Sequence, residues 1–67
     1  MVKCVIKMIH NDVASYYEYE NIGILDLDVL DRIEVNGVKA EVRMKSSKIV
    51  DDELTITYTV SSSGVPQ

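Results

Sequence analysis

The chain has 67 residues, of which 46% are hydrophobic, and a net charge of −4 with a single cysteine. A chain of this length forms one small domain with a thin core, and one cysteine excludes an intrachain disulfide. No apolar run approaches the roughly 20 residues of a membrane helix, so we expect a cytoplasmic protein without a membrane segment.

The first half of the chain predicts a β-hairpin. Apolar residues alternate over residues 2–9, which places Val2, Cys4, Ile6 and Met8 on one face of a strand. A turn-prone segment, residues 10–12, precedes a second strand over residues 15–20. There Tyr17 and Tyr19 share one face, and Tyr16, Glu18 and Glu20 share the other.

The segment from Ile24 to Ile33 fits both a strand and a helix. Leu25, Val29 and Ile33 recur at helical spacing, and the early carboxylates Asp26 and Asp28 suit the positive end of a helix dipole. We therefore predict a helix here.

The second half of the chain predicts two further strands. Asn36 and Gly37 both tolerate the positive φ of a type I′ turn. Alternation then puts Val38, Ala40, Val42 and Met44 on a buried face, and a last strand follows over residues 54–60. The expected fold is α+β: an antiparallel sheet with one helix, in the order ββαββ. We expect a single domain over residues 1–60, a frayed tail over residues 61–67, and a homodimer, because so short a chain builds only a small core alone.

Catalytic and metal-binding motifs are not found in the sequence. Cys4 and His10 lie roughly 20 Å apart along an extended strand, too far for a nucleophile and its base. Cys4 is interpreted as a buried hydrophobe and His10 as a turn residue. The Asp26, Asp28 and Asp31 carboxylates lack the glycine turn and the glutamate of a calcium loop. We expect no enzyme activity, no cofactor and no metal.

Charge is unevenly distributed along the chain. Residues 12–36 hold seven carboxylates and one arginine, a net charge of −6. A solvated acidic face is one reading, and attraction to a cationic partner is another. The cations Lys39, Arg43 and Lys45 alternate on one predicted strand without aromatic neighbours, so they are read as a solvated face and not as a nucleic-acid site.

The run Tyr16-Tyr17-Glu18-Tyr19, followed after a short gap by Asp26-Leu27-Asp28-Val29-Leu30, resembles the small dimeric uracil-DNA glycosylase inhibitors of Bacillus phages. The resemblance covers roughly residues 6–45. Leu27 stands where that family has an aromatic residue, and Asp31 stands where it has a tyrosine.

The resemblance implies a DNA mimic that occupies the DNA-binding cleft of a host glycosylase. Glu18 would stand in for a DNA phosphate, flanked by Tyr16 and Tyr19. Leu27 and Leu30 would line a pocket in a dimer that captures the apolar residue which the enzyme wedges into DNA. The implied partner-binding residues are Tyr16, Glu18, Tyr19, Asp26, Leu27, Asp28, Leu30 and Asp31.

Two other classes of function stay open. The chain could be an interaction module for a different basic host or defence protein. It could also bind nucleic acid through Lys39, Arg43 and Lys45, although its acidic charge disfavours this.

Overall fold

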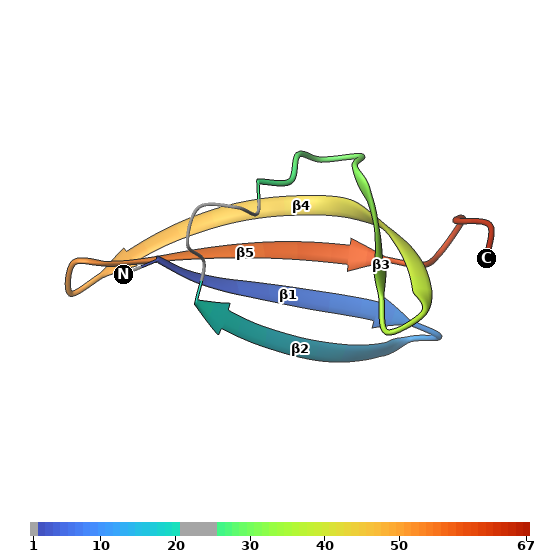
Figure 1. Cartoon of the computed structure of the whole chain (residues 1–67), viewed down its shortest axis with the longest axis horizontal. Helices are drawn as coiled ribbons and strands as arrows, with labels where there is room; N and C mark the ends of the chain where they lie inside the picture. The colour runs from blue at the N-terminus through green and yellow to red at the C-terminus, as the bar shows by residue number, and fades with distance from the viewer. Residues whose placement is uncertain (1, 21–25) are drawn as a thin grey trace.

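A computed structural model describes residues 2–20 and 26–67 of the chain. These residues form five strands: β1 (Val2–His10), β2 (Val13–Glu20), β3 (Arg32–Val35), β4 (Val38–Val50) and β5 (Glu53–Ser61). The strands lie in one sheet in the order β2-β1-β5-β4-β3, which curls into a half-barrel (Figure 1). The hairpin predicted from the first two strands is confirmed by the antiparallel pairing of β1 with β2.

Three two-residue turns join the hairpins. Asn11-Asp12, Asn36-Gly37 and Asp51-Asp52 all have positive φ at both positions. Strand partners close directly around each turn, as in the pair Val35 and Val38. Positive φ at both central residues is the geometry of a type I′ turn, which matches the twist of the adjoining strands. The turn predicted at Asn36-Gly37 is therefore confirmed, and asparagine and aspartate supply the same geometry at the other two sites.

The core lies on one face of the sheet, here called the inner face. Cys4, Ile6 and Met8 of β1 are buried on it beside Tyr58 and Val60 of β5. Ala40 and Val42 of β4 complete the buried cluster. The alternation predicted for residues 2–9 and 54–60 is confirmed, as is the burial of Cys4.

The expected α+β fold is wrong, because the described residues form five strands and no helix. Of the predicted helix, residues 24 and 25 lie outside the described part of the chain. Residues 26–28 are irregular, and Arg32–Val35 is strand β3. Ile33 and Val35 pack against the core as alternating strand residues, and this β-branched pair is better suited to a strand than to a helix. Burial against the core therefore selects the strand, although the sequence fits both helical and strand spacing.

The sheet is also mixed and not purely antiparallel. β1 pairs in parallel with β5, from Val2 beside Leu54 to Ile9 beside Ser61. This central parallel pair joins the β1–β2 hairpin to the β4–β5 hairpin, and it brings the end of β1 next to the end of β5 (Figure 1).

A register shift in β4 turns the side chains in the second half of the strand to the opposite faces of the sheet. The shift lies between Val42, which is opposite Val60, and Met44, which is opposite Thr59. One extra residue moves every later side chain to the other face. Met44, predicted to be buried, is 60% exposed, and Lys45 turns inward over the Tyr58 ring at 5.7 Å.

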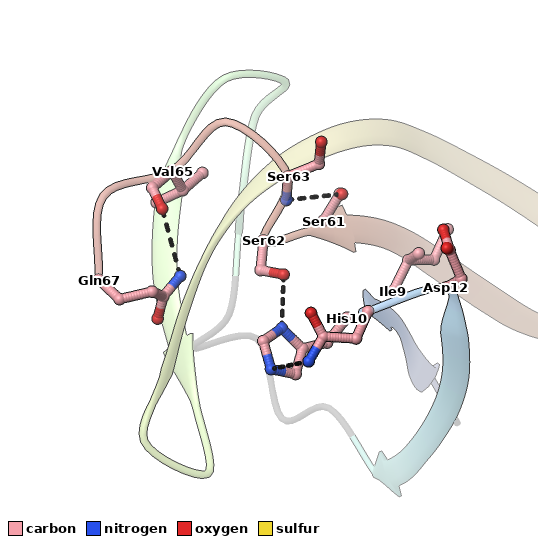
Figure 2. Close-up of a pocket in the computed structure, with 9 residues that line it drawn as sticks. Ile9, His10, Asp12, Ser61, Ser62, Ser63, Val65 and Gln67 are labelled. Atoms are coloured by element: carbon pink, nitrogen blue, oxygen red, sulfur yellow. Dashed lines mark hydrogen bonds between the residues drawn. The ribbon is translucent and has the colours of Figure 1, made fainter.

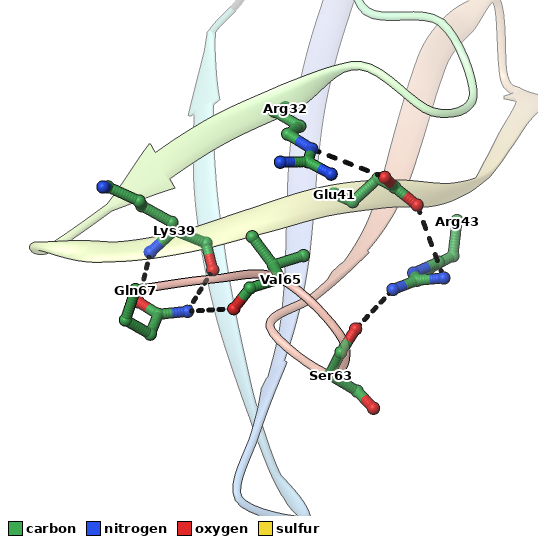
Figure 3. A network of polar contacts seen from close by, with 7 residues as sticks. All are labelled: Arg32, Lys39, Glu41, Arg43, Ser63, Val65 and Gln67. Carbon is green, nitrogen blue, oxygen red and sulfur yellow. Dashed lines mark hydrogen bonds and ion pairs between the residues drawn. The ribbon is translucent and has the colours of Figure 1, made fainter.

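The C-terminal segment, expected as a frayed tail, makes several contacts. Val65 is buried, and the side-chain amide of Gln67 both accepts from Lys39 N–H and donates to the Lys39 carbonyl (Figure 3). Arg43 donates to the Ser63 carbonyl. These bonds hold residues 63–67 against the first half of β4.

Candidate protein-binding edge

Strand β2 is an open edge of the sheet. Its eight residues pair with β1 alone within the described part of the chain. The pairing is continuous from Val13 to Glu20, with no bulge. The strand has no lysine and no proline, and its first five residues carry no charge. Natural proteins protect edge strands with lysine, proline, other charges or a bulge. Because β2 has no bulge, lysine or proline and begins with five uncharged residues, it is suited to pairing with another chain.

The turn geometry fixes which backbone groups face outward. In a two-residue turn, the N–H of the residue after the turn bonds back to the carbonyl before it, so Val13 N–H points toward β1. Backbone direction alternates along an antiparallel strand. Ala14, Tyr16 and Glu18 therefore present their N–H and C=O groups away from the sheet.

Tyr16 and Glu18 place their side chains on the outer face, opposite the core. Tyr16 is 64% exposed, and the Lys7 ammonium lies 5.9 Å from its ring centroid. Glu18 lies 3.6 Å from the Lys3 ammonium, and the two side chains are 59% and 41% exposed. An ion pair this exposed contributes little to stability, so Glu18 can exchange Lys3 for another cation at small cost.

Tyr19, the third aromatic residue of the predicted site, lies on the inner face. Its hydroxyl accepts from the Cys4 thiol at 3.3 Å, while part of its ring remains exposed. Burial of the hydroxyl, and then its contact with Cys4, raise the pKa of Tyr19 well above the usual value near 10. Tyr19 is therefore a neutral anchor between β2 and β1.

A shallow depression connects these residues at one end of β2. It has a volume of about 280 Å³ and is lined by Lys3, Glu18, Tyr19, Glu20 and Glu53. Three of the five lining residues are carboxylates. Glu20 was predicted to share a face with Glu18, but Glu53 was missed as a site residue, because only the β1–β5 pairing brings it to this end.

The remaining predicted site residues lie along β4, on the other side of the sheet from β2. Leu27 packs against the core, and its N–H donates to the Tyr58 hydroxyl at 3.3 Å. The Asp26 carboxylate accepts from the Lys45 ammonium at 3.1 Å and raises the pKa of that lysine. Both residues thus fasten the segment before β3 to the sheet.

Asp28, Leu30 and Asp31 form a tight turn in that segment. The Asp31 carboxylate accepts from Asp28 N–H at 2.9 Å, and Asp31 N–H donates to the Asp28 carbonyl. Leu30 has a φ of +80° and is 68% exposed. Its N–H donates to the Val42 carbonyl, and Val42 N–H donates to the Asp31 carbonyl. The turn is therefore locked onto β4 at the register shift.

The eight residues implied by the resemblance accordingly fall into two groups. Tyr16, Glu18 and Tyr19 stay together on β2. Asp26 to Asp31 lie by β4, with β1 and β5 between the two groups. No helix is present among the described residues, so the pocket that Leu27 and Leu30 were expected to line in a dimer is not built from helices there.

The basic residues of β4 do not form the common face expected from alternation. Arg43 pairs with Glu41 at 3.4 Å, and Arg32 contacts the same carboxylate at 3.6 Å (Figure 3). Lys45 points inward to Asp26. The register shift and these ion pairs separate the cations, so they offer no continuous track for phosphates.

Two further kinds of site are not found in residues 2–20 and 26–67. Among them, no three His, Cys, Asp or Glu side chains gather where they could hold a metal ion. The same residues include no helix long and apolar enough to cross a membrane.

Comparison with known proteins gave no match. No protein-family model, curated protein or solved structure matches the chain. The candidate site therefore rests on the geometry of β2 and on the residues that this strand carries.

Proposed function

We propose that the protein is a protein inhibitor that presents strand β2 to the basic, DNA-binding cleft of a partner, with uracil-DNA glycosylase as the first candidate. The observation that carries the proposal is the open β2 edge with Tyr16 and Glu18 exposed on it. The resemblance of the run Tyr16–Tyr19 to the phage inhibitors supplies the named partner.

Charge complementarity supports this choice of partner. Glu18, Glu20 and Glu53 line one depression in which Lys3 is the one cation. A cleft that binds DNA is cationic, so it attracts such a surface and speeds association. Tyr16 beside the carboxylates adds a large, rigid contact of the kind that dominates interface energetics.

The proposal is confined to β2 and the depression beside it. Leu27 is packed against the core, and Leu30 belongs to a turn fixed on β4. Capture of a DNA-wedging residue by these two leucines is therefore not part of the proposed mechanism.

An excision assay tests the proposal with a matched pair of variants. The intact protein is titrated into a uracil-excision reaction, and we expect inhibition near one inhibitor dimer per enzyme. Glu18→Gln removes a charge at the site and should weaken inhibition by about 2–5 kcal/mol if the carboxylate is desolvated against a cation. Glu34→Gln removes an exposed carboxylate from β3 and should leave inhibition unchanged. No inhibition at large molar excess would exclude the glycosylase as partner.

A second copy of the chain is the partner we propose for the backbone edge of β2. An antiparallel pairing with Tyr16 opposite Tyr16 of the second copy sets Val13 opposite Tyr19, and Ala14 opposite Glu18. Val13 is 62% exposed and Tyr19 38%, so this register covers the exposed apolar residues of β2 and keeps the Glu18 side chains apart. The outer-face side chains stay free to meet the glycosylase. Light scattering at micromolar concentration should give the mass of a dimer; a strictly monomeric mass would contradict the pairing.

A different basic protein is the alternative partner for the same edge. Capture from bacterial lysate of one basic protein, in amounts that Glu18→Gln reduces and Glu34→Gln does not, would favour it when glycosylase inhibition fails.

A further inference from the structure

The ends of β1 and β5 bring together two polar side chains that the sequence keeps 52 positions apart. His10 Nδ1 lies 2.6 Å from Ser62 Oγ, and both residues are half-buried (Figure 2). The parallel pairing of β1 with β5 sets this position, because Ile9 is opposite Ser61 and its carbonyl accepts from Ser62 N–H. A second contact follows on the other side of the ring, where the Asn11 side-chain amide lies 3.3 Å from Nε2.

This arrangement faces an open cavity of about 320 Å³. Ile9 and Val65 give it apolar walls, and Asp12 is the one charged residue among its nine lining residues. A cavity with one carboxylate and no cation disfavours anionic ligands. It suits a short, uncharged acyl group that contacts the two apolar side chains.

From this geometry we infer that Ser62 is a nucleophile for small, uncharged acyl esters, with His10 as its general base and Asn11 as a positioning residue. The inference is independent of the proposed inhibitor function, because β2 takes no part in it. A hydroxyl within hydrogen-bond reach of an imidazole, whose other nitrogen contacts a third group, is the arrangement that activates a serine.

The orientation of the Asn11 amide selects the form of His10. With the amide nitrogen toward Nε2, the ring accepts there and carries its proton on Nδ1, so Ser62 is an acceptor. Rotation of the amide by 180° presents Oδ1, which accepts from Nε2–H and leaves the lone pair of Nδ1 free for the Ser62 proton. The second form is the reactive one.

Acyl transfer at this site needs no cofactor. Ser62 Oγ bonds to the ester carbonyl carbon, its proton passes to His10 Nδ1, and the bond to the leaving alkoxide or phenolate breaks. His10 then gives that proton to the leaving oxygen, directly or through water, and the alcohol or phenol departs. In the second step His10 takes a proton from water as the water oxygen bonds to the acyl carbon, and returns it to Ser62 Oγ as the acyl–serine bond breaks. The products are the free acid and the regenerated serine.

Mass spectrometry of the intact protein after reaction with p-nitrophenyl acetate tests the inference. We expect one acetyl adduct, located on Ser62 by peptide mapping. His10→Gln should slow its formation by about 10²-fold, the size of a general-base contribution. Ser46→Ala, which removes an exposed hydroxyl from β4, should leave the rate unchanged. Circular dichroism of each variant establishes that the sheet is intact.

Asn11→Asp gives a second test that does not depend on losing activity. A carboxylate only accepts hydrogen bonds, so it holds the proton on Nε2 and keeps Nδ1 ready as the base. Aspartate already occupies positive-φ turn positions at residues 12, 51 and 52, so the turn is compatible with it. We expect a several-fold faster acetylation of Ser62, because a larger share of the molecules then holds His10 in the reactive form. No adduct on Ser62, an adduct spread equally over other serines and lysines, or a Ser62 adduct indifferent to His10→Gln would overturn the inference.

Discussion

The two edges of the sheet differ in length, charge and anchoring. β2 has eight residues, and its first five are uncharged. β3 has four residues, two of them charged, and the turn before it is bonded to β4. Short length and charge are the devices by which proteins keep an edge from pairing with other chains. The short β3 edge thus carries these devices, whereas β2 lacks most of them, and this difference is the basis of the proposal that partners bind at β2.

Proline substitutions in β2 should give the largest difference between backbone groups that face inward and outward. Ser15→Pro removes an N–H that faces β1, and leaving its partner carbonyl unsatisfied should destabilise the fold by about 1–3 kcal/mol. Ala14→Pro removes an N–H that faces solvent, a position where edge strands tolerate proline. We expect the Ala14→Pro variant to keep nearly the same free energy of unfolding and to lose the ability to dimerise. Urea unfolding and light scattering measure the two effects.

Equal destabilisation by the two proline variants would show that β2 is not an open edge. Retention of the dimer by Ala14→Pro would place the contact between copies elsewhere. Either result would remove the contrast between β2 and β3.

Leu30→Gly should strengthen the attachment to β4 of the turn that precedes β3. A leucine at a φ of +80° costs about 1–3 kcal/mol, and glycine adopts that conformation freely. Because the Leu30 side chain is mostly exposed, little packing is lost, and the greater freedom of glycine in the unfolded chain offsets part of the gain. We expect a net stabilisation of about 1 kcal/mol in urea unfolding, with binding at β2 unaffected. A clear loss of stability would indicate that the leucine side chain supports the turn.

Alkaline pH should loosen β2 before β3. The pKa of Tyr19 is raised on folding, so the folded state holds this proton more tightly than the unfolded state does. The contribution of protonated Tyr19 to the free energy of unfolding is intact below the usual tyrosine pKa of about 10 and declines as the pH rises above that value. Tyr19→Phe removes the ionisation, so its stability should fall less steeply between pH 9 and 11, roughly the range in which a free tyrosine titrates. Identical pH dependence in both proteins would show that Tyr19 does not link β2 to the core.

Local patterns in the sequence predict most of the strands but not their arrangement. Alternation identified the inward residues of β1 and β5, and Asn36-Gly37 identified its turn. The segment before β3 was misread as a helix because Leu25, Val29 and Ile33 also satisfy helical spacing, whereas burial of Ile33 and Val35 beside β4 determines the outcome. The register shift after Val42 has no signal in the alternation, and it alone exposes Met44.

The candidate site was predictable only where it lies within one strand. Tyr16, Glu18 and Tyr19 are close in sequence, so alternation assigns their faces correctly. Glu53 joins them, and Ser62 meets His10, through the parallel pairing of β1 with β5. That pairing joins segments about 50 residues apart, and no short motif records it.

Amide hydrogen exchange of the labelled protein, alone and with uracil-DNA glycosylase, tests the open β2 edge most directly. In dilute free protein, below the concentration of any dimer, we predict fast exchange at Ala14, Tyr16 and Glu18 and slow exchange at Ser15 and Tyr17. Addition of the glycosylase should slow exchange along β2 and leave β3 unchanged. Protection confined to β3 and β4, or slow exchange at all β2 amides of the free monomer, would contradict the account.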